Sequence, residues 1–324
     1  RVRGWTNPVY LVFLFSLILT GLTLVPGVGT TINGASRWLK VGAVTFQPSE
    51  MVKWSMVLVL AWWCTRKRGV MHTFRFGLIV PLFIIGFSCA LIVIEDLGTA
   101  VLIGGVSLCI LIAGGARWWH LALVVPPGVV GVVAAIIPSP YRVARLTSFM
   151  DPWADPRGTG YHAIQSMLAF AQGGLSGRGL GNGIQKFGDL PADTTDFVYA
   201  VICEELGLVG AVAVIGLYLA LVWIGLSIIK RAGDCFGRLV ALGVITTVGL
   251  QAMINLAVVT VVVPTKGIAL PLISAGGTGW VMTAFALGLV AGMDRPLDEP
   301  TVSISPSTAG SHPATSSVTR AVTT

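Results

Sequence analysis

The chain has 324 residues, of which 54% are hydrophobic and only 11% are charged, and its formal net charge is +7. A soluble domain of this length would contain about 25% charged residues, so the composition excludes an ordinary soluble protein and indicates an all-α, polytopic membrane protein. The basic excess does not indicate nucleic acid binding, because the lysines and arginines cluster in alternate loops, as they do in cytoplasmic loops of membrane proteins.

Eight apolar stretches are predicted to be transmembrane helices, because each is long enough to cross a hydrocarbon core of about 30 Å. They cover approximately residues 9–26, 48–64, 76–94, 97–114, 118–137, 197–228, 239–263 and 270–292. Residues 1–296 are expected to form this membrane domain. Residues 297–324 are rich in Ser, Thr, Ala and Pro without periodicity, which predicts a disordered cytoplasmic tail.

The first loop on the predicted outer side carries two basic residues, Arg37 and Lys40, and the helices around it begin with acids. Glu50 and Lys53 are spaced i,i+3 and can form an ion pair on one helix face. Asp96 precedes another helix, where a carboxylate favours the positive end of the helix dipole. Pairing and capping are the preferred interpretations of these acids.

The connection from about residue 138 to 196 is the longest between predicted spans. Its lysines and arginines lie on the translocated side, which favours an anionic ligand such as a phosphate or diphosphate; a solvated surface is the equally weighted alternative. Its segment GGLSGRGLGNG (173–183) could turn N–H groups toward an anion. It lacks the P-loop pattern, however, so tight turns or close helix approach are the favoured interpretation.

The segment DTTDFVYAVICEELG (193–207) holds four of the chain's scarce acids, and three of them, Asp196, Glu204 and Glu205, lie beside an apolar run. A carboxylate near hydrocarbon costs several kcal/mol unless it is paired or lines a wet cavity. Local sequence favours a helix N-cap for Asp196. Helical geometry places Glu204 about 80° from Asp196, so both are expected to face one cavity, while Glu205 points elsewhere. One of the two glutamates is expected to pair with a basic residue.

The segment VPTKGIALPLISAGGTG (263–279) interrupts apolar sequence with Lys266, two prolines and a glycine pair. This pattern is typical of broken backbone that lines a cavity. The four histidines and five cysteines form no metal-ligand spacing and no hydrolase motif.

Seven motifs occur in one order: NGASRW, QPSEMVK, DLGTA, RLTSFMDPWADPRGTGYH, QSMLAFAQGGLSGRGLGNGIQK, LPADTTDFVYAVICEELGLVG and PTKGIALPLISAGG. Together they resemble the SEDS family of cell-wall proteins (FtsW, RodA and SpoVE), and most closely its division branch, FtsW. The resemblance implies a ten-helix fold. The eight spans would then correspond to that fold without its first two helices, which agrees with the missing initiator Met. Glu95, Ala275 and Gly188 depart from the family pattern.

The resemblance implies a peptidoglycan glycosyltransferase that polymerises lipid II at the outer face of the bacterial inner membrane, at the division septum. It assigns the general base to Asp196. Implied partners are a class B penicillin-binding transpeptidase and other divisome proteins. A lipid II transporter (flippase) and a non-catalytic divisome scaffold remain alternative functions.

The chemistry of that reaction predicts further roles for charged residues. The expected ligands of the diphosphate are Arg145, Arg157, Lys186, Lys266, Arg37 and Lys53. The residues expected to support the cavity are Glu50, Asp96, Glu204, Glu205 and Ser274. A divalent cation, Mg²⁺ or Mn²⁺, is a further expectation at Asp196, because one carboxylate and substrate phosphates commonly hold such an ion.

Overall fold

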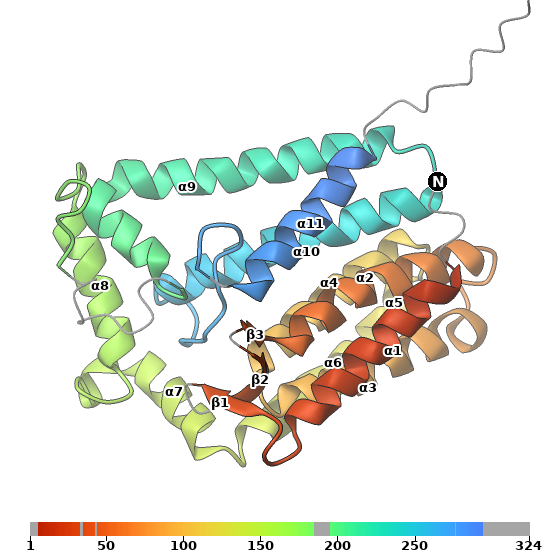
Figure 1. Cartoon of the computed structure of the whole chain (residues 1–324), viewed down its shortest axis with the longest axis horizontal. Helices are drawn as coiled ribbons and strands as arrows, with labels where there is room; N and C mark the ends of the chain where they lie inside the picture. The colour runs from red at the N-terminus through yellow and green to blue at the C-terminus, as the bar shows by residue number, and fades with distance from the viewer. Residues whose placement is uncertain (1–5, 33–34, 43, 185–194, 276, 294–324) are drawn as a thin grey trace, which may run out of the picture. The chain divides into compact units, whose positions relative to one another are not determined.

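The computed structural model describes residues 6–32, 35–42, 44–184, 195–275 and 277–293 (Figure 1). The larger elements are α1 (Thr6–Thr23), α2 (Pro48–Arg66), α3 (Ile79–Val93), α4 (Leu97–Ala113), α6 (Val125–Ile136), α7 (Pro140–Met150), α8 (Tyr161–Gly173), α9 (Val198–Arg231), α10 (Cys235–Val259) and α11 (Thr278–Gly292). The shorter ones are β1 (Thr30–Ile32), β2 (Ala35–Val41), β3 (Val44–Phe46), α5 (Trp118–Ala122), a π-helical turn η2 (Phe74–Leu78) and a 3₁₀ turn η3 (Pro152–Ala154). Lys186, Gly188 and the predicted tail lie outside the described residues.

The predicted all-α fold is confirmed, and each predicted span overlaps a helix or two consecutive helices. In the described part of the chain, four segments are long and apolar enough to cross a membrane: 74–93, 118–136, 198–231 and 235–259. Shorter apolar helices occupy 8–23, 97–113 and 278–292. The exact number of crossings therefore stays a prediction. The predicted start of the last span at residue 270 is wrong, because residues 270–275 are not helical and α11 begins at Thr278, after Gly277 with φ of 48°.

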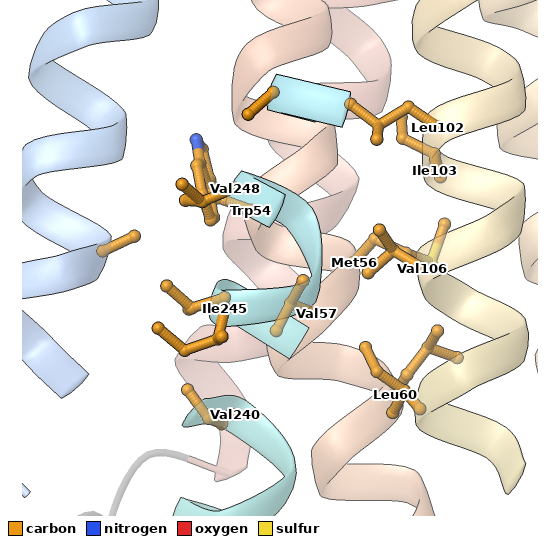
Figure 2. Close-up of a cluster of buried hydrophobic side chains, with 14 of the residues drawn as sticks. Trp54, Met56, Val57, Leu60, Leu102, Ile103, Val106, Val240, Ile245 and Val248 are labelled. Atoms are coloured by element: carbon orange, nitrogen blue, oxygen red, sulfur yellow. The ribbon is translucent and has the colours of Figure 1, made fainter. Parts of the chain in front are cut away.

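The packed centre of the helix bundle lies where α2, α4 and α10 meet (Figure 2). Nine of its labelled side chains are at most 4% exposed: Met56, Val57, Leu60, Leu102, Ile103, Val106, Val240, Ile245 and Val248. A Cβ placed on Gly243 of α10 would lie 2.4 Å from Cγ1 of Val57, so α10 approaches α2 too closely for any side chain there. Small residues allow such close helix packing in membrane proteins.

The first outer loop folds into a three-stranded antiparallel sheet in the order β1-β2-β3, which the sequence analysis did not predict. Strands β2 and β3 pair in register from Leu39 opposite Phe46 to Val41 opposite Val44. The strands are short and rich in β-branched and aromatic residues, which favour extended backbone. The sheet matters for function because β2 carries Arg37 to the start of α4.

The long connection contains the helices α7 and α8, and α8 packs against α9. A Cβ on Gly173 would lie 1.9 Å from the carbonyl oxygen of Cys203, so the two helices touch backbone to backbone. Helix α9 is itself kinked at Gly207, whose φ of 63° and ψ of −157° are open mainly to glycine. Close approach is thus the observed role of Gly173, one of the two roles predicted for the segment 173–183.

Candidate active site

Asp196 lies just before α9, at the junction between the long connection and the helix. The N-cap position belongs to Phe197, and among the described residues no N–H of α9 bonds to the Asp196 carboxylate, so the N-cap interpretation is wrong. Its main-chain oxygen accepts a hydrogen bond of 2.8 Å from Nδ2 of Asn255. Its carboxylate faces Gly267, where an added Cβ would lie 2.7 Å from Oδ2.

Arg37 approaches the same point from the sheet. A Cβ on Gly267 would lie 3.7 Å from a guanidinium nitrogen of Arg37, so Arg37 and Asp196 flank this glycine. The other side of the guanidinium forms an ion pair of 2.8 Å with Asp96. Asp96 also caps α4 by accepting from the Thr99 N–H at 3.0 Å, which confirms the predicted cap. The cap and the ion pair hold Arg37 beside Asp196.

Arg145 reaches the segment 261–277, which connects α10 to α11, from α7. Its Nη1 donates to the carbonyl oxygen of Thr265 at 3.1 Å, and its guanidinium lies 4.5 Å from the ring centroid of Tyr141. Lys266 follows directly in the chain. Burial lowers the pKa of Lys266; the charge of Asp96 opposes this effect, while nearby Arg145 adds to it. A lysine in such a field is more easily neutralised than one in water and gains from an anionic ligand.

The carboxyl of Asp196 has a pKa raised to about 6. Burial is the main cause; Arg37 opposes it, Asp96 adds to it, and Arg145 opposes it. The carboxyl therefore titrates close to neutral pH, beside the charges of Arg37 and Arg145. Such a group is able to accept a proton and to release it again.

Two polar residues of α10, Gln251 and Asn255, hold the broken segment that carries Lys266. Asn255 donates from Nδ2 to the main-chain oxygens of Asp196 and Ile268, the latter at 2.7 Å. One turn earlier, Gln251 donates to the carbonyl oxygen of Ala269 at 2.9 Å. Neither residue was predicted from the sequence. Two amides one turn apart in an apolar helix were the available signal.

Lys53 is engaged inside the bundle rather than in the cluster around Asp196. Its Nζ lies 2.7 Å from Glu50 and donates to Oε1 of Gln251 at 2.9 Å, and its side chain is 2% exposed. The predicted Glu50–Lys53 ion pair is confirmed. The prediction that Lys53 binds the diphosphate is not supported by this geometry, since its ammonium group is already bound and buried.

Ser274 supports the backbone before Asp196. Its hydroxyl accepts from the Leu270 N–H at 2.7 Å and donates to the carbonyl oxygen of Thr195. This hydroxyl therefore ties the segment 261–277 to the residue that precedes Asp196.

Glu204 and Glu205 both bind the glycine-rich segment 173–183 and its continuation. Glu204 lies 3.5 Å from Nη1 of Arg178, the kind of ion pair predicted for one of the two, and accepts from the Ile184 N–H at 2.8 Å. Glu205 accepts from the N–H groups of Gly181 and Gly183. The expectation that Glu205 points elsewhere is wrong, because the segment wraps around the end of the short helix before the kink. The glycine N–H groups do bind anions, and these are the protein's own carboxylates.

Three further predictions concern Arg157, Lys186 and a metal ion. Arg157 is exposed in the turn between η3 and α8, and no ion pair of its side chain occurs among the described residues. Lys186 lies outside them.

Within the described part there is no group of three or more metal-ligating side chains. Asp196 fits a divalent cation only as one carboxylate ligand, because Asp96 is committed to Arg37 and Thr99.

His162 of α8 is another residue that the sequence analysis did not select. Its ring stacks on that of Phe197, with centroids 5.5 Å apart and planes at 14°. Burial and the charge of Arg145 lower the pKa of His162, so the imidazole is neutral at pH 7. The stack packs α8 against the residue that follows Asp196.

Comparison with known proteins identifies the family. The FtsW/RodA/SpoVE family model, described as a cell cycle protein, matches residues 1–298. The chain belongs to this family. It is 43% identical over 298 residues to a probable peptidoglycan glycosyltransferase FtsW of Nitrosococcus halophilus (strain Nc4), covering 91% of this chain and 77% of that one. It is 38% identical over 295 residues to stage V sporulation protein E of Bacillus subtilis (strain 168), covering 90% and 80% of the two chains.

Solved structures of FtsW/RodA/SpoVE relatives share the fold. A structure described as "Structural coordination of polymerization and crosslinking by a peptidoglycan synthase complex" matches with a TM-score of 0.73 and 30% identity, covering 90% of this chain and 82% of that one. The Thermus thermophilus rod shape determining protein RodA matches with a TM-score of 0.63 and 27% identity, covering 89% and 78%. Together with the long apolar helices, this family membership makes the chain a multi-pass membrane protein.

Proposed function

We propose that this FtsW/RodA/SpoVE protein is a peptidoglycan glycosyltransferase that polymerises lipid II, with Asp196 as the general base. The observation that carries the proposal is the Asp196 carboxyl, which has a pKa of about 6, lies beside Arg37 and Arg145, and faces Gly267, the residue after Lys266, at a break between helices. Relatives named peptidoglycan glycosyltransferase support the reaction class.

The reaction forms a glycosidic C–O bond and breaks the bond between the anomeric carbon and the diphosphate of the donor. The acceptor hydroxyl loses its proton as it attacks, and Asp196 takes that proton. At neutral pH a carboxyl with a pKa of about 6 is mostly ionised and still basic enough to assist. One base suffices, because the leaving diphosphate departs from the opposite face of the sugar.

The diphosphate leaves with negative charge, which the basic side chains around Gly267 would stabilise. Arg37 and Arg145 are each fixed by a hydrogen bond to protein, so they need little reorganisation when the charge develops. A divalent cation bound by Asp196 and the substrate phosphates would neutralise further charge. Buried Lys266 completes the set and favours an anion more strongly than a solvated lysine does.

Within the proposal, a penicillin-binding transpeptidase is the partner and the division septum is the site of action. Support comes from the FtsW relatives and from the peptidoglycan synthase complex that shares the fold. The described charged cluster lies at one end of the bundle, which favours a polymerase over a lipid II transporter, since a transporter needs a passage with polar groups along the membrane depth.

The test compares wild-type protein with Asp196→Asn in detergent, with the transpeptidase partner and labelled lipid II. We expect wild type to form glycan polymer and Asp196→Asn to lose at least about 100-fold in rate, as loss of a general base does. Asp234→Asn is the matched control, because Asp234 caps α10 and an asparagine there still accepts the Gly237 N–H.

Equal rates for Asp196→Asn and wild type would reject Asp196 as the base while keeping the enzyme. No polymer from wild type, with transport of labelled lipid II across vesicle membranes, would favour the transporter. Polymer formed in detergent dismisses the transporter as the main function, because no second compartment is present. Repeating the assay with chelator and then with Mg²⁺ or Mn²⁺ tests the cation.

A further inference from the structure

The end of the helix bundle opposite Asp196 carries a cluster of basic residues that the proposed reaction does not use. Helix α2 has 19 residues and so runs about 28 Å from the Glu50 end to Arg66. Figure 1 shows the α2–α3 loop and α5 at this end, with the sheet, α7 and α8 at the other. The basic–aromatic surface is defined by five exposed cations: Arg66, Lys67, Arg68, Arg75 and Arg117.

The two loops that carry these cations form one preformed surface. The rings of Phe74 and His120 lie 5.6 Å apart, which joins η2 to α5. A Cβ on Gly114 would lie 2.5 Å from Sγ of Cys64, so the loop after α4 packs against α2. Nε1 of Trp63 donates to the carbonyl oxygen of Gly77 at 2.9 Å, which fixes the π-helical turn η2 to α2. Tight packing thus fixes the loops that carry the cations relative to one another.

No acid neutralises this surface within its own part of the chain. The sequence has no Asp or Glu from residue 51 to 94 or from 97 to 150. Among the described residues, none of the five cations forms an ion pair. The other basic loop at this end, around Lys230 and Arg231, differs because Asp234 lies within it. The basic–aromatic surface therefore presents uncompensated positive charge.

Aromatic rings lie beside the cations at this surface. The Arg66 guanidinium lies 5.2 Å from the Trp62 ring centroid, and the Arg75 guanidinium 5.9 Å from that of Phe76. Trp118 and Trp119 stack with centroids 3.4 Å apart and remain 56% and 62% exposed. Exposed tryptophans next to apolar helices mark the level of the lipid headgroups. We therefore expect these cations to lie at the depth of the lipid phosphates.

We propose that the basic–aromatic surface binds an anionic phospholipid headgroup of the leaflet at this end, which the charge bias assigns to the cytoplasm. Several cations gathered between helices suit a headgroup with two phosphates, as in cardiolipin. The alternative explanation is that the cations serve only as the positive charge that orients the protein during membrane insertion. That role does not require loops packed together through Trp63, Gly77 and Gly114. It does not require aromatic rings beside the cations either. Those features indicate a site for a headgroup.

The test titrates purified, detergent-solubilised protein with cardiolipin, phosphatidylglycerol or phosphatidylcholine and counts bound lipid by native mass spectrometry. We expect cardiolipin to bind most tightly and phosphatidylcholine least. The double variant Arg75→Gln/Arg117→Gln should weaken cardiolipin binding about tenfold or more, since each cation contributes about 1 kcal/mol near phosphate. The matched control Lys230→Gln/Arg231→Gln removes the same charge from the neighbouring loop and should change binding less than about threefold.

Equal weakening by both double variants, or no preference for cardiolipin over phosphatidylcholine, would overturn the proposal, because bulk charge alone would then explain the binding. If Arg75→Gln/Arg117→Gln does not fold, the single variant Arg68→Gln takes its place, since Arg68 is exposed and has no ring contact among the described residues. Inorganic phosphate added to wild type at constant ionic strength separates the two sources of phosphate. Full displacement of cardiolipin by it would mean that the site takes free phosphate and would also reject the lipid.

Discussion

At the scale of single residues, Asp196 is controlled by its charged neighbours. Arg145 holds the Asp196 pKa below the value that burial alone would give. We therefore expect Arg145→Gln to move the acidic limb of the kcat/KM profile from about pH 6 to higher pH, with a larger loss of activity at about pH 6 than at about pH 8. Lys40→Gln, an exposed change on β2, is the control and should leave the limb in place. A limb that stays or moves to lower pH would contradict the assignment of Asp196 as the base.

The same raised pKa predicts a gain in stability when the charge is removed. The folded protein holds a proton on Asp196 up to about pH 6, whereas the unfolded chain releases it near 3.8, so ionisation of Asp196 destabilises the fold as pH rises through this window. We expect Asp196→Asn to have a higher Tm than wild type at about pH 7.5, with the two values converging below about pH 4. Thermal unfolding followed by tryptophan fluorescence at several pH values measures this. A lower Tm for the variant at neutral pH would show that the carboxylate is structural.

Asn255 is expected to act by positioning Asp196 rather than by touching substrate. Asn255→Leu leaves the main-chain oxygens of Asp196 and Ile268 without their donor, at a cost of about 1–3 kcal/mol for each buried group. We expect kcat to fall about 10- to 100-fold with a smaller change in KM, because a shift of the base by a fraction of an ångström weakens catalysis more than binding. Met253→Leu, an exposed change on the same helix, is the control. A change in KM alone, with kcat intact, would contradict the positioning role.

At the scale of elements, the helices were predictable because a long apolar stretch within a membrane can form all of its backbone hydrogen bonds internally only as a helix. The sheet β1-β2-β3 was not, since its strands are short and their pairing depends on contacts distant in sequence. The Glu50–Lys53 pair and the Asp96 cap followed from local spacing. The approach of Arg37 to Asp196 could not be predicted, because it depends on the path of three separate loops around Gly267.

The kink of α9 gives a sharp prediction for one glycine. Gly207 has φ of 63°, and a Cβ there would lie 2.4 Å from the backbone nitrogen of Gly177. We expect Gly207→Ala to destabilise the protein by about 1–3 kcal/mol and to reduce activity, because strain and overlap displace the segment held by Glu204 and Glu205. Gly216→Ala on the same helix meets nothing within 4 Å, so it should be neutral or slightly stabilising. Equal Tm values for the two variants would show that the kink is not required.

At the scale of the whole described bundle, its two ends carry different charge chemistry. One end combines acids with arginines around Asp196, and the basic–aromatic surface at the other presents cations without acids. Glu50 and Lys53, in the first two turns of α2, lie near the Asp196 end, and with Gln251 they connect α2 to α10 and, through Ala269, to the segment 261–277. We expect packing changes in this buried network to reach the site through the segment 261–277.

The final prediction concerns this buried network. Lys53→Met leaves the nearly buried Glu50 carboxylate without its cation, which should cost about 3–5 kcal/mol of unfolding free energy. The double change Glu50→Gln/Lys53→Met removes both charges, and we expect it to recover at least about half of that loss. We expect the catalytic rate to depend on the position of the segment 261–277. If the network positions Lys266 and Asp196 through Gln251, the double variant recovers its stability but its catalytic rate stays low. Full recovery of both stability and catalytic rate would show that the Glu50–Lys53 pair only balances its own buried charge.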